Sequence, residues 1–248
     1  MDAAVLTRSG DALDRALARA DLYRELAAGL RDPDGPQAAA VDPDVVVEAA
    51  EALGLALSLT TGSAIRGAAD PAVRAHQHRE LFGHVVAQGC PPYETEYGRR
   101  HVFGQAQELA DIAAFYNAFG LATSAGGERV DHVATELEFL AVLALKEALA
   151  LAREEADPAE RARSGAAGFL RDHAGRWIPA LAALIEQRAP EGAYAAFTGL
   201  AAALVEVHGR ELGVEPEALG PGDLRPILEE PDGFAFECGV DADDDIPR

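Results

Sequence analysis

Basic residues are scarce in this chain, and lysine is almost missing. Its 248 residues include 42 acidic and 21 basic side chains, for a formal net charge of −21, and Lys146 is its single lysine. Such a surface repels the phosphate backbone of nucleic acid, so we expect no nucleic-acid partner. A cationic polypeptide is a better candidate. A high-salt cytoplasm also favours many acidic residues and few lysines, so the acidic excess has two alternative explanations.

Long apolar runs and cysteines are also lacking. No run approaches the roughly 18 apolar residues of a membrane span, and the first thirty residues lack the basic-then-apolar order of a secretory signal. We therefore expect a cytoplasmic protein with no membrane span. The two cysteines, Cys90 and Cys238, permit at most one intramolecular disulfide and have no metal-site spacing, so we expect reduced thiols.

Catalytic motifs are missing too. The chain contains no G-x-S-x-G and no G-x-x-x-x-G-K-[ST], and Lys146 follows no glycine loop. Cys90 and Ser124 are the candidate nucleophiles, but neither has a base at a recognisable spacing. These absences favour a binding protein over an enzyme, with no cofactor of its own.

What the sequence does contain is helical periodicity along most of its length. Apolar residues recur at i, i+3/i+4 and i+7, and no segment shows a sustained strand alternation. The pattern predicts helices at about 13–30, 43–60, 69–89, 109–119, 131–155, 158–173, 175–188 and 191–210. We therefore predict an all-α, single-domain helical bundle over residues 1–212. Residues 213–248 are rich in Pro, Gly and Asp and predict an irregular acidic tail.

Several residues mark the ends of these helices. Asp70 is a predicted N-cap with Pro71 at the first helical position, and Gly120 supplies a left-handed C-terminal turn. Asp131 is the predicted cap of the longest helix. The buried stripe of that helix is predicted to consist of Val133, Leu137, Leu140 and Ala144.

One stretch, "CPPYETEYGRR" at residues 90–100, cannot join a helix. Pro91 and Pro92 lack backbone N–H groups and fix their φ angles, so the chain must be extended there. A stiff segment loses little entropy on binding, and it carries two tyrosines and two glutamates. We interpret it as a recognition loop that lies beside the Asp131 helix start. In the alternative, the tyrosines pack beneath the loop and the glutamates are merely solvated.

Four motifs carry a family resemblance: "ELFG" at 80–83, "PPYETEYG" at 91–98, "FYNAFGL" at 115–121 and "DHVATELEFL" at 131–140. In this order and spacing, over about residues 10–210, the chain resembles the TorD/DmsD/NarJ family of molybdoenzyme maturation chaperones. The loop motif at 91–98 is most similar to that of the branch whose clients are type II enzymes of the dimethyl sulfoxide reductase family. One departure is Val130, where family members often carry proline before the Asp-His pair.

The resemblance implies an all-helical TorD-like fold and a cytoplasmic helper that performs no chemistry. Its implied partner is the catalytic subunit of a molybdenum oxidoreductase, held until the molybdenum cofactor is inserted. The implied ligand is the N-terminal leader of that subunit, often a twin-arginine leader. The resemblance allows monomers and domain-swapped homodimers, and it does not name the client.

Acidic side chains suit such a ligand, because arginine pairs bidentately with carboxylates. Asp131 and Glu136 are expected to form an acidic pocket wall, and His132 lies at i, i+4 from Glu136. In the alternative, Asp131 only caps the helix and Glu136 accepts a hydrogen bond from His132. The predicted peptide-binding residues are Tyr93, Glu94, Glu96, Tyr97, Tyr116, Asp131, His132 and Glu136.

Two other functions remain open. One is a helical metal-binding enzyme that uses His132 and Glu136, because both side chains are metal ligands. His76, Glu80 and His84 also share a helix face, although ordinary i, i+4 hydrogen bonds explain that spacing. The other alternative is a scaffold that binds a folded partner and ignores an isolated leader peptide.

Overall fold

The protein is an all-α bundle over the part of the chain that the structure describes. The computed structural model describes residues 3–82, 90–98, 104–123 and 127–224, with side chains from residue 10 onward. Their α-helices are α1 Ala3–Leu30, α2 Pro43–Ala52, α3 Leu59–Gly67, α4 Pro71–Phe82, α5 Gln105–Ala118, α6 Val133–Ala152, α7 Ala156–Asp172, α8 Ala174–Arg188 and α9 Ala193–Leu212. Two isolated β-bridges are the only strand-like pairing within these ranges. The predicted fold class is confirmed.

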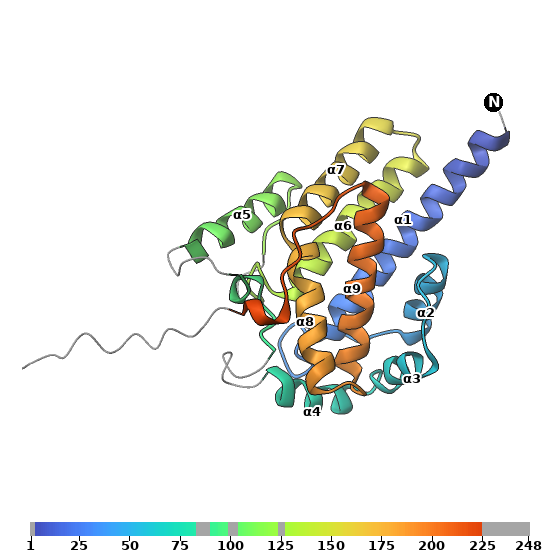
Figure 1. Cartoon of the computed structure of the whole chain (residues 1–248). Coiled ribbons are helices and arrows are strands. Elements are labelled where there is room, and N and C mark those ends of the chain that lie inside the picture. Colours follow the sequence, from blue (N-terminus) through green and yellow to red (C-terminus); the bar gives the residue numbers. More distant parts are fainter. Residues whose placement is uncertain (1–2, 83–89, 99–103, 124–126, 225–248) are drawn as a thin grey trace, which may run out of the picture.

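Five long helices form the body of the bundle. Helix α1 packs most extensively on α6, α6 packs on α7, and α8 packs on α9 (Figure 1). Helices α2, α3 and α4 cover one end and one side of this body, whereas α5 stands on the opposite side from α2 (Figure 1). Within the described residues, no helix is long and apolar enough to cross a membrane.

Most predicted helix ends agree with the structure. Helix α1 ends at Leu30, just before the predicted stop, and the Asp70 carboxylate accepts a hydrogen bond of 2.9 Å from the Ala72 N–H at the start of α4. Gly120 follows α5 with φ of +75°, the left-handed turn that the sequence predicts. The part of the predicted third helix beyond Phe82 lies outside the described residues until Cys90.

The helix predicted over 43–60 is wrong, because this stretch contains the end of one helix and the start of another. Gly54 has φ of +74°, which ends α2, and Leu55 N–H then bonds back to the Ala50 carbonyl oxygen at 2.9 Å. Ser58 starts α3 by accepting the Thr61 N–H at 3.0 Å. The left-handed glycine and the serine cap therefore divide into two helices a stretch whose apolar spacing predicts one.

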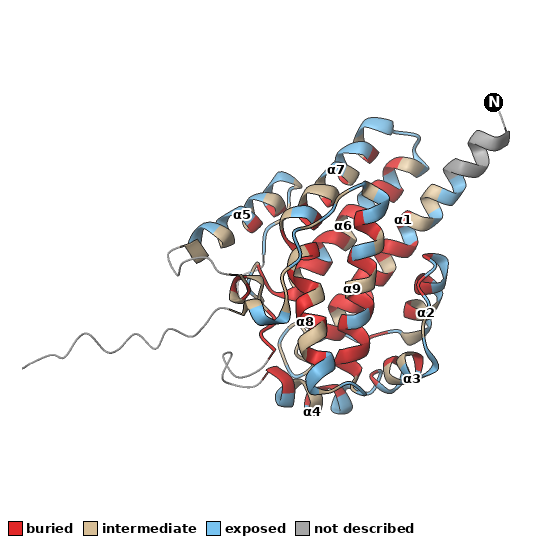
Figure 2. Cartoon of the chain, viewed as in Figure 1, coloured by how far each residue is buried: buried red, intermediate tan, exposed pale blue. Residues whose placement is uncertain are grey.

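The core lies where α6, α8 and α9 meet α1, as the band of buried residues in Figure 2 shows. The predicted buried stripe of α6 is confirmed, since none of its four side chains exceeds 1% exposure. Burial of a valine or leucine side chain contributes about 1.5–3 kcal/mol, so this stripe stabilises the packing of α6 in the bundle.

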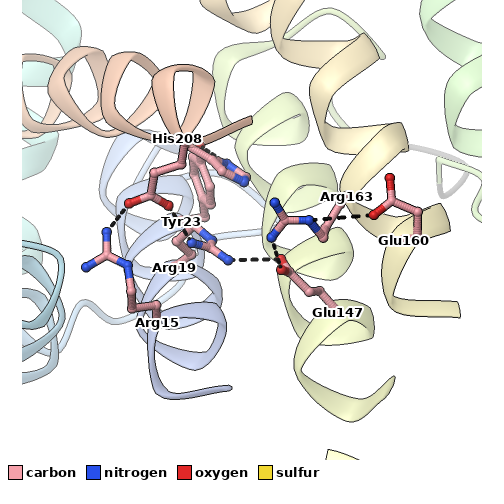
Figure 3. A network of polar contacts seen from close by, with 8 residues as sticks. Arg15, Arg19, Tyr23, Glu147, Glu160, Arg163 and His208 are labelled. Carbon is pink, nitrogen blue, oxygen red and sulfur yellow. Dashed lines mark hydrogen bonds and ion pairs between the residues drawn. The ribbon is translucent and has the colours of Figure 1, made fainter. Parts of the chain in front are cut away.

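A network of charges is enclosed between α1, α6, α7 and α9 (Figure 3). Arg19 is 4% exposed and donates to Glu147 at 2.9 Å and to Glu211 at 2.7 Å. Arg163 reaches the other oxygen of Glu147 at 3.0 Å, and Arg15 also pairs with Glu211. Glu147 is only 3% exposed and pairs with two arginines. Its carboxylate therefore compensates the positive charge of Arg19, whose side chain is also buried.

We predict that Glu147→Ala destabilises the fold by roughly 3–5 kcal/mol, because it leaves Arg19 buried without its inner partner. Chemical denaturation measures this change in the free energy of unfolding. Glu160→Ala is the matched control, since Glu160 is 72% exposed and lies 3.9 Å from the same Arg163. Its expected effect is below about 1 kcal/mol. Equal effects of the two substitutions would contradict this reading of the network.

The chain after α9 returns across the bundle surface. Gly213 turns with φ of +70°, and the Leu219 N–H then bonds to the Arg176 carbonyl oxygen at 2.8 Å. A side chain on Gly175 would clash with the Pro216 ring and with the Leu170 carbonyl, so glycine permits this close approach. The segment ends in a 3-10 turn, Pro221–Asp223. We call residues 214–224 the strap; residues 225–248 of the predicted tail lie outside the described residues.

Candidate functional site

The Pro-Pro loop leaves the helical pattern as predicted. Tyr93 is extended, with φ of −123° and ψ of 129°, and Glu94–Glu96 form a single 3-10 turn. Tyr93 forms an isolated antiparallel bridge with His132, and the Val133 N–H bonds to the Pro92 carbonyl oxygen at 2.9 Å. The loop therefore lies directly against the start of α6, which confirms its predicted neighbour.

Asp131 holds this loop in place. Its carboxylate accepts hydrogen bonds from the Thr95 N–H at 3.2 Å and the Thr95 hydroxyl at 2.7 Å, and its backbone carbonyl accepts the Glu94 N–H at 2.9 Å. Arg129 completes the group with an ion pair of 2.8 Å to the same carboxylate. Asp131 is fully buried, so its carboxylate interacts with the loop and not with solvent. We call these contacts the Asp131 clamp.

The prediction that Asp131 caps α6 is wrong. His132 is the N-cap, and its Nδ1 accepts the Ala134 N–H at 3.1 Å. The Asp131 carboxylate does not cap the helix because its oxygens already accept hydrogen bonds from Thr95 and Arg129. Burial lowers the pKa of His132 to about 3, helped by the positive charges of Arg31, His78 and Arg129. His132 is therefore neutral at physiological pH, as an acceptor Nδ1 requires.

Glu136 lies deeper than predicted and contacts different residues. Its Oε2 accepts the indole N–H of Trp177 at 2.9 Å, and its carboxyl group is in hydrogen-bonding contact with Glu94. The Glu136 N–H bonds to the His132 carbonyl oxygen at 3.0 Å, but among the described residues no side-chain hydrogen bond joins the two. Burial raises the pKa of Glu136 well above its usual range, and the negative charge of Glu94 raises it further. A neutral, fully buried Glu136 is not part of an exposed acidic wall.

The three predicted tyrosines occupy different depths. Tyr97 is only 2% exposed, donates its hydroxyl to the Pro91 carbonyl at 2.9 Å and packs on Trp177, so it lies beneath the loop. Tyr116 is also buried, and its hydroxyl donates to the Val130 carbonyl at 2.7 Å. Tyr93 alone is half-buried, with the Arg129 guanidinium 4.3 Å from its ring centre.

The two predicted glutamates remain accessible to different extents. Glu94 retains 13% of its side-chain exposure and contacts His173 Nδ1 at 3.1 Å. Glu96 is half-buried. The structure thus places Glu94, and not Asp131 or Glu136, where this site meets solvent.

Glu94 forms the floor of an open cleft between α5, the corner joining α7 to α8, and the strap. The cleft has a volume of about 810 Å³ and continues into a hollow of about 330 Å³ that shares Glu94, Glu108, Arg176 and Glu217. Phe115 forms its apolar wall. Acidic residues exceed basic ones in the lining: Glu94, Glu108, Asp111, Asp172, Glu215, Glu217 and Asp223 against Arg171 and Arg176.

Three residues of this site were not predicted from the sequence. His173 lies at the corner between α7 and α8, where its ring packs on Phe115 and Phe169. Trp177 reaches Glu136 from one turn further along α8. A buried indole needs an acceptor for its N–H, so a lone tryptophan in an apolar helix was a usable signal. His173 and Phe115 gave no comparable signal, because only the packing of α5 brings them together.

The candidate metal ligands do not gather in the described residues. No three His, Cys, Asp or Glu side chains there come close enough to hold a metal ion. His76 and Glu80 form an exposed i, i+4 pair with 3.5 Å between Nε2 and Oε1, and His84 lies outside the described residues. Cys90 is a buried free thiol, and Cys238 also lies outside the described residues.

The helical bundle and its cleft define an all-α protein with an acidic cleft that is open to solvent. Comparison with known proteins then identifies the family: residues 44–183 match the family described as nitrate reductase delta subunit, and the chain belongs to this NarJ/TorD-type family. The resemblance drawn from the four motifs is therefore confirmed.

Two relatives carry more specific names. The chain is similar to a selenate reductase assembly chaperone protein from Thauera selenatis, with 34% identity over 160 residues, covering 62% of this chain and 80% of the relative. It is also similar to a chlorate reductase assembly chaperone protein from Ideonella dechloratans, with 37% identity over 110 residues, covering 44% of this chain and 55% of the relative. Both are named as chaperones rather than as enzymes.

The low pKa of His132 leads to a prediction about acid stability. The unfolded chain has the ordinary histidine pKa of about 6.5, whereas the folded value is about 3. The stability from neutral His132 is therefore fully present above pH 6.5 and is lost as the pH falls toward 3. His132→Asn keeps a helix-capping side chain but cannot titrate.

Between pH 7.5 and 5, we expect wild type to lose roughly 2 kcal/mol of unfolding free energy relative to His132→Asn, at about 1.4 kcal/mol per pH unit below 6.5. Urea denaturation at each pH measures the difference. Buried His208, whose pKa is also lowered, is present in both proteins and cancels. Parallel pH profiles for the two proteins would contradict the buried, neutral state of His132.

Proposed function

We propose that this chain is an assembly chaperone that binds the catalytic subunit of a molybdenum oxidoreductase before its cofactor is inserted. It acts in the cytoplasm, performs no chemistry itself, and binds the N-terminal leader segment of its client. The observation that carries the proposal is the family match over residues 44–183, together with two relatives named as reductase assembly chaperones.

The acidic cleft supports a polypeptide ligand with basic residues. Its two hollows share four lining residues, and the carboxylates of the lining outnumber the arginines. One arginine of the lining, Arg171, is already paired with Asp172 at 2.5 Å. Oriented carboxylates of this kind attract a cationic segment and speed its association.

Purification of the tagged chain from its native host tests the proposal. A bound reductase catalytic subunit should co-purify and be identified by mass spectrometry. In a host that lacks the chaperone gene, the same subunit should accumulate with little molybdenum, and re-expression should restore its metal content. A subunit fully loaded with molybdenum in the absence of the chain would contradict the proposal.

The rim of the cleft provides a more local prediction. Glu108→Gln combined with Asp111→Asn should weaken binding of the client's leader peptide by about 1.4- to fivefold per carboxylate, since exposed charge pairs contribute about 0.2–1 kcal/mol. The matched control, Glu48→Gln with Glu51→Gln, removes the same charge from exposed positions on α2. Fluorescence titration at about 0.05 M and 0.5 M salt measures both effects, and the rim contribution should shrink at high salt. Equal losses in the two double variants would indicate that charge alone, and not the cleft, attracts the peptide.

A further inference from the structure

A second hollow of the molecule is lined mainly by basic side chains. It lies between the ends of α5 and α6 and the start of α7, and it has a volume of about 370 Å³. Lys146, Arg153 and Arg161 line it, and Glu155 is the single carboxylate of the lining. Acidic residues outnumber basic ones in the chain by 42 to 21, so this lining has the opposite charge balance to the chain as a whole. We call it the basic hollow.

The three cations of the basic hollow are exposed and unpaired. In the part of the chain that the structure describes, none of them forms an ion pair or a side-chain hydrogen bond. Other arginines of α7 are paired, since Arg163 contacts Glu147 and Arg171 contacts Asp172. Like charges that share one hollow repel one another, so an anionic ligand there lowers the electrostatic energy.

Apolar surface lies beside these cations. Leu149 lines the basic hollow and is 47% exposed, and Leu145, one turn earlier on α6, is 45% exposed. Phe119 and Pro158 add to the apolar part of the lining. A ligand that combines carboxylates with apolar side chains therefore suits this surface, because it compensates the charge and also covers the leucines.

The chain itself contains a segment with this chemistry. Residues 225–248, which lie outside the described residues, contain eight acidic and two basic side chains. Four of the acidic residues are the aspartates of "DADDD" at 241–245, which we call the acidic run. Two aromatic residues, Phe234 and Phe236, precede it.

The strap brings this segment within reach of the basic hollow. It lines the acidic cleft as far as Asp223. Ala118 lines both the cleft and the basic hollow, and α7 leads from Pro158 in the hollow to Asp172 in the cleft. These 14 residues of helix span about 21 Å. Asp241 follows Asp223 by 18 residues, which cover at most about 60 Å, more than twice that length.

Electrostatics favours the basic hollow over the cleft for this segment. The cleft that the strap lines is predominantly acidic, so it repels a run of aspartates. Attachment to the same chain also raises the local concentration of the acidic run at the basic hollow. Exposed charge pairs that are weak between separate molecules are then sufficient for docking.

We propose that the acidic run docks on the basic hollow of the same chain, where its carboxylates pair with Lys146, Arg153 and Arg161. The contact is non-covalent and electrostatic. It compensates the unpaired cations, so a cationic segment of the client meets less positive charge on this side of the bundle. This last consequence rests on the proposed function, whereas the docking itself does not.

Crosslinking with a water-soluble carbodiimide tests the docking in the full-length chain. The reagent joins an amine to a carboxylate that is in contact with it, and Lys146 has the single side-chain amine of the chain. We expect Lys146 to crosslink to aspartates of the acidic run, as identified by peptide mass spectrometry. The yield should fall at least about twofold between 0.05 M and 0.5 M salt. Crosslinks to Glu155 alone, or no crosslinks, would overturn the proposal.

A pair of variants tests the other two cations. Arg153→Gln combined with Arg161→Gln keeps the reporter lysine and should lower the crosslinking yield at least about twofold, as expected for two exposed charge pairs. The matched control, Arg24→Gln with Arg210→Gln, removes the same charge from exposed positions on α1 and α9 and should leave the yield unchanged. Equal losses in the two double variants would overturn the assignment to the basic hollow.

Mixing two isotopically labelled forms of the chain identifies which copy supplies the acidic run. We expect crosslinks within one copy. Crosslinks between differently labelled copies in place of these would overturn docking within one chain, because the occupant would then be the segment of a second copy.

The resonance of Lys146 provides a readout that needs no crosslinking. Reductive methylation with carbon-13 keeps the charge of the amine and gives one side-chain signal. Replacement of all four aspartates of the acidic run with asparagine should shift this signal. The control, Glu229→Gln with Glu230→Gln and Asp232→Asn, removes charge from the same segment outside the run and should not shift it. An unchanged signal in the first variant, or equal shifts in both, would overturn the proposal.

These outcomes are separable from the chaperone function. If the chain captures a reductase subunit but Lys146 does not crosslink to the acidic run, the docking is wrong and the chaperone function stands. If Lys146 crosslinks to the acidic run but no reductase subunit co-purifies, the docking stands and the proposed client is wrong.

Discussion

The site depends on the Asp131 clamp. A proline pair prevents residues 90–98 from joining a helix, so something other than helical hydrogen bonds must hold the segment against the bundle. The Asp131 carboxylate does so by accepting hydrogen bonds from the backbone N–H and the hydroxyl of Thr95. The Asp131 backbone carbonyl also accepts a hydrogen bond from the Glu94 N–H. Buried polar groups of this kind stabilise one arrangement strongly, because each loses a partner if the loop moves.

The clamp determines where the neighbouring carboxylate lies. Thr95 bonds to Asp131, and the adjacent Glu94 meets His173 and Glu136 instead. Three elements distant in sequence thus converge on one carboxylate: the loop, α6 and the corner between α7 and α8. The strap contacts the same loop further along, where the Gly98 N–H bonds to the Asp223 carbonyl oxygen at 2.6 Å. A stiff loop therefore presents a charge at the floor of a cleft whose walls come from helices.

Much of the fold could be predicted from the sequence, and less of the site. Helical periodicity placed most of the helices, because burial of an apolar stripe depends on local spacing. It failed at residues 43–60, where Gly54 and Ser58 separate two helices within one apolar pattern. The loop and its neighbour at Asp131 could be predicted because prolines restrict the backbone locally.

The roles of the acidic residues could not be predicted, because they depend on long-range packing. Asp131 precedes α6 like a cap, yet Thr95, 36 residues upstream, takes its carboxylate and leaves His132 to cap the helix. Glu136 lies one turn into α6 like a surface residue, yet Trp177 buries it. No local pattern indicates that α5 leaves an open cleft over Glu94, since that depends on how its aromatic side chains pack on α7.

Photocrosslinking tests most directly whether the cleft over Glu94 is where the partner binds. A photoreactive phenylalanine at Ala114, an exposed residue of α5 in the cleft lining, should crosslink to the N-terminal segment of the client subunit. The same residue at Leu149, which is 47% exposed on α6 and lies outside this cleft, should not. Crosslinks from position 149 but not from position 114 would contradict the account and move the binding surface to α6.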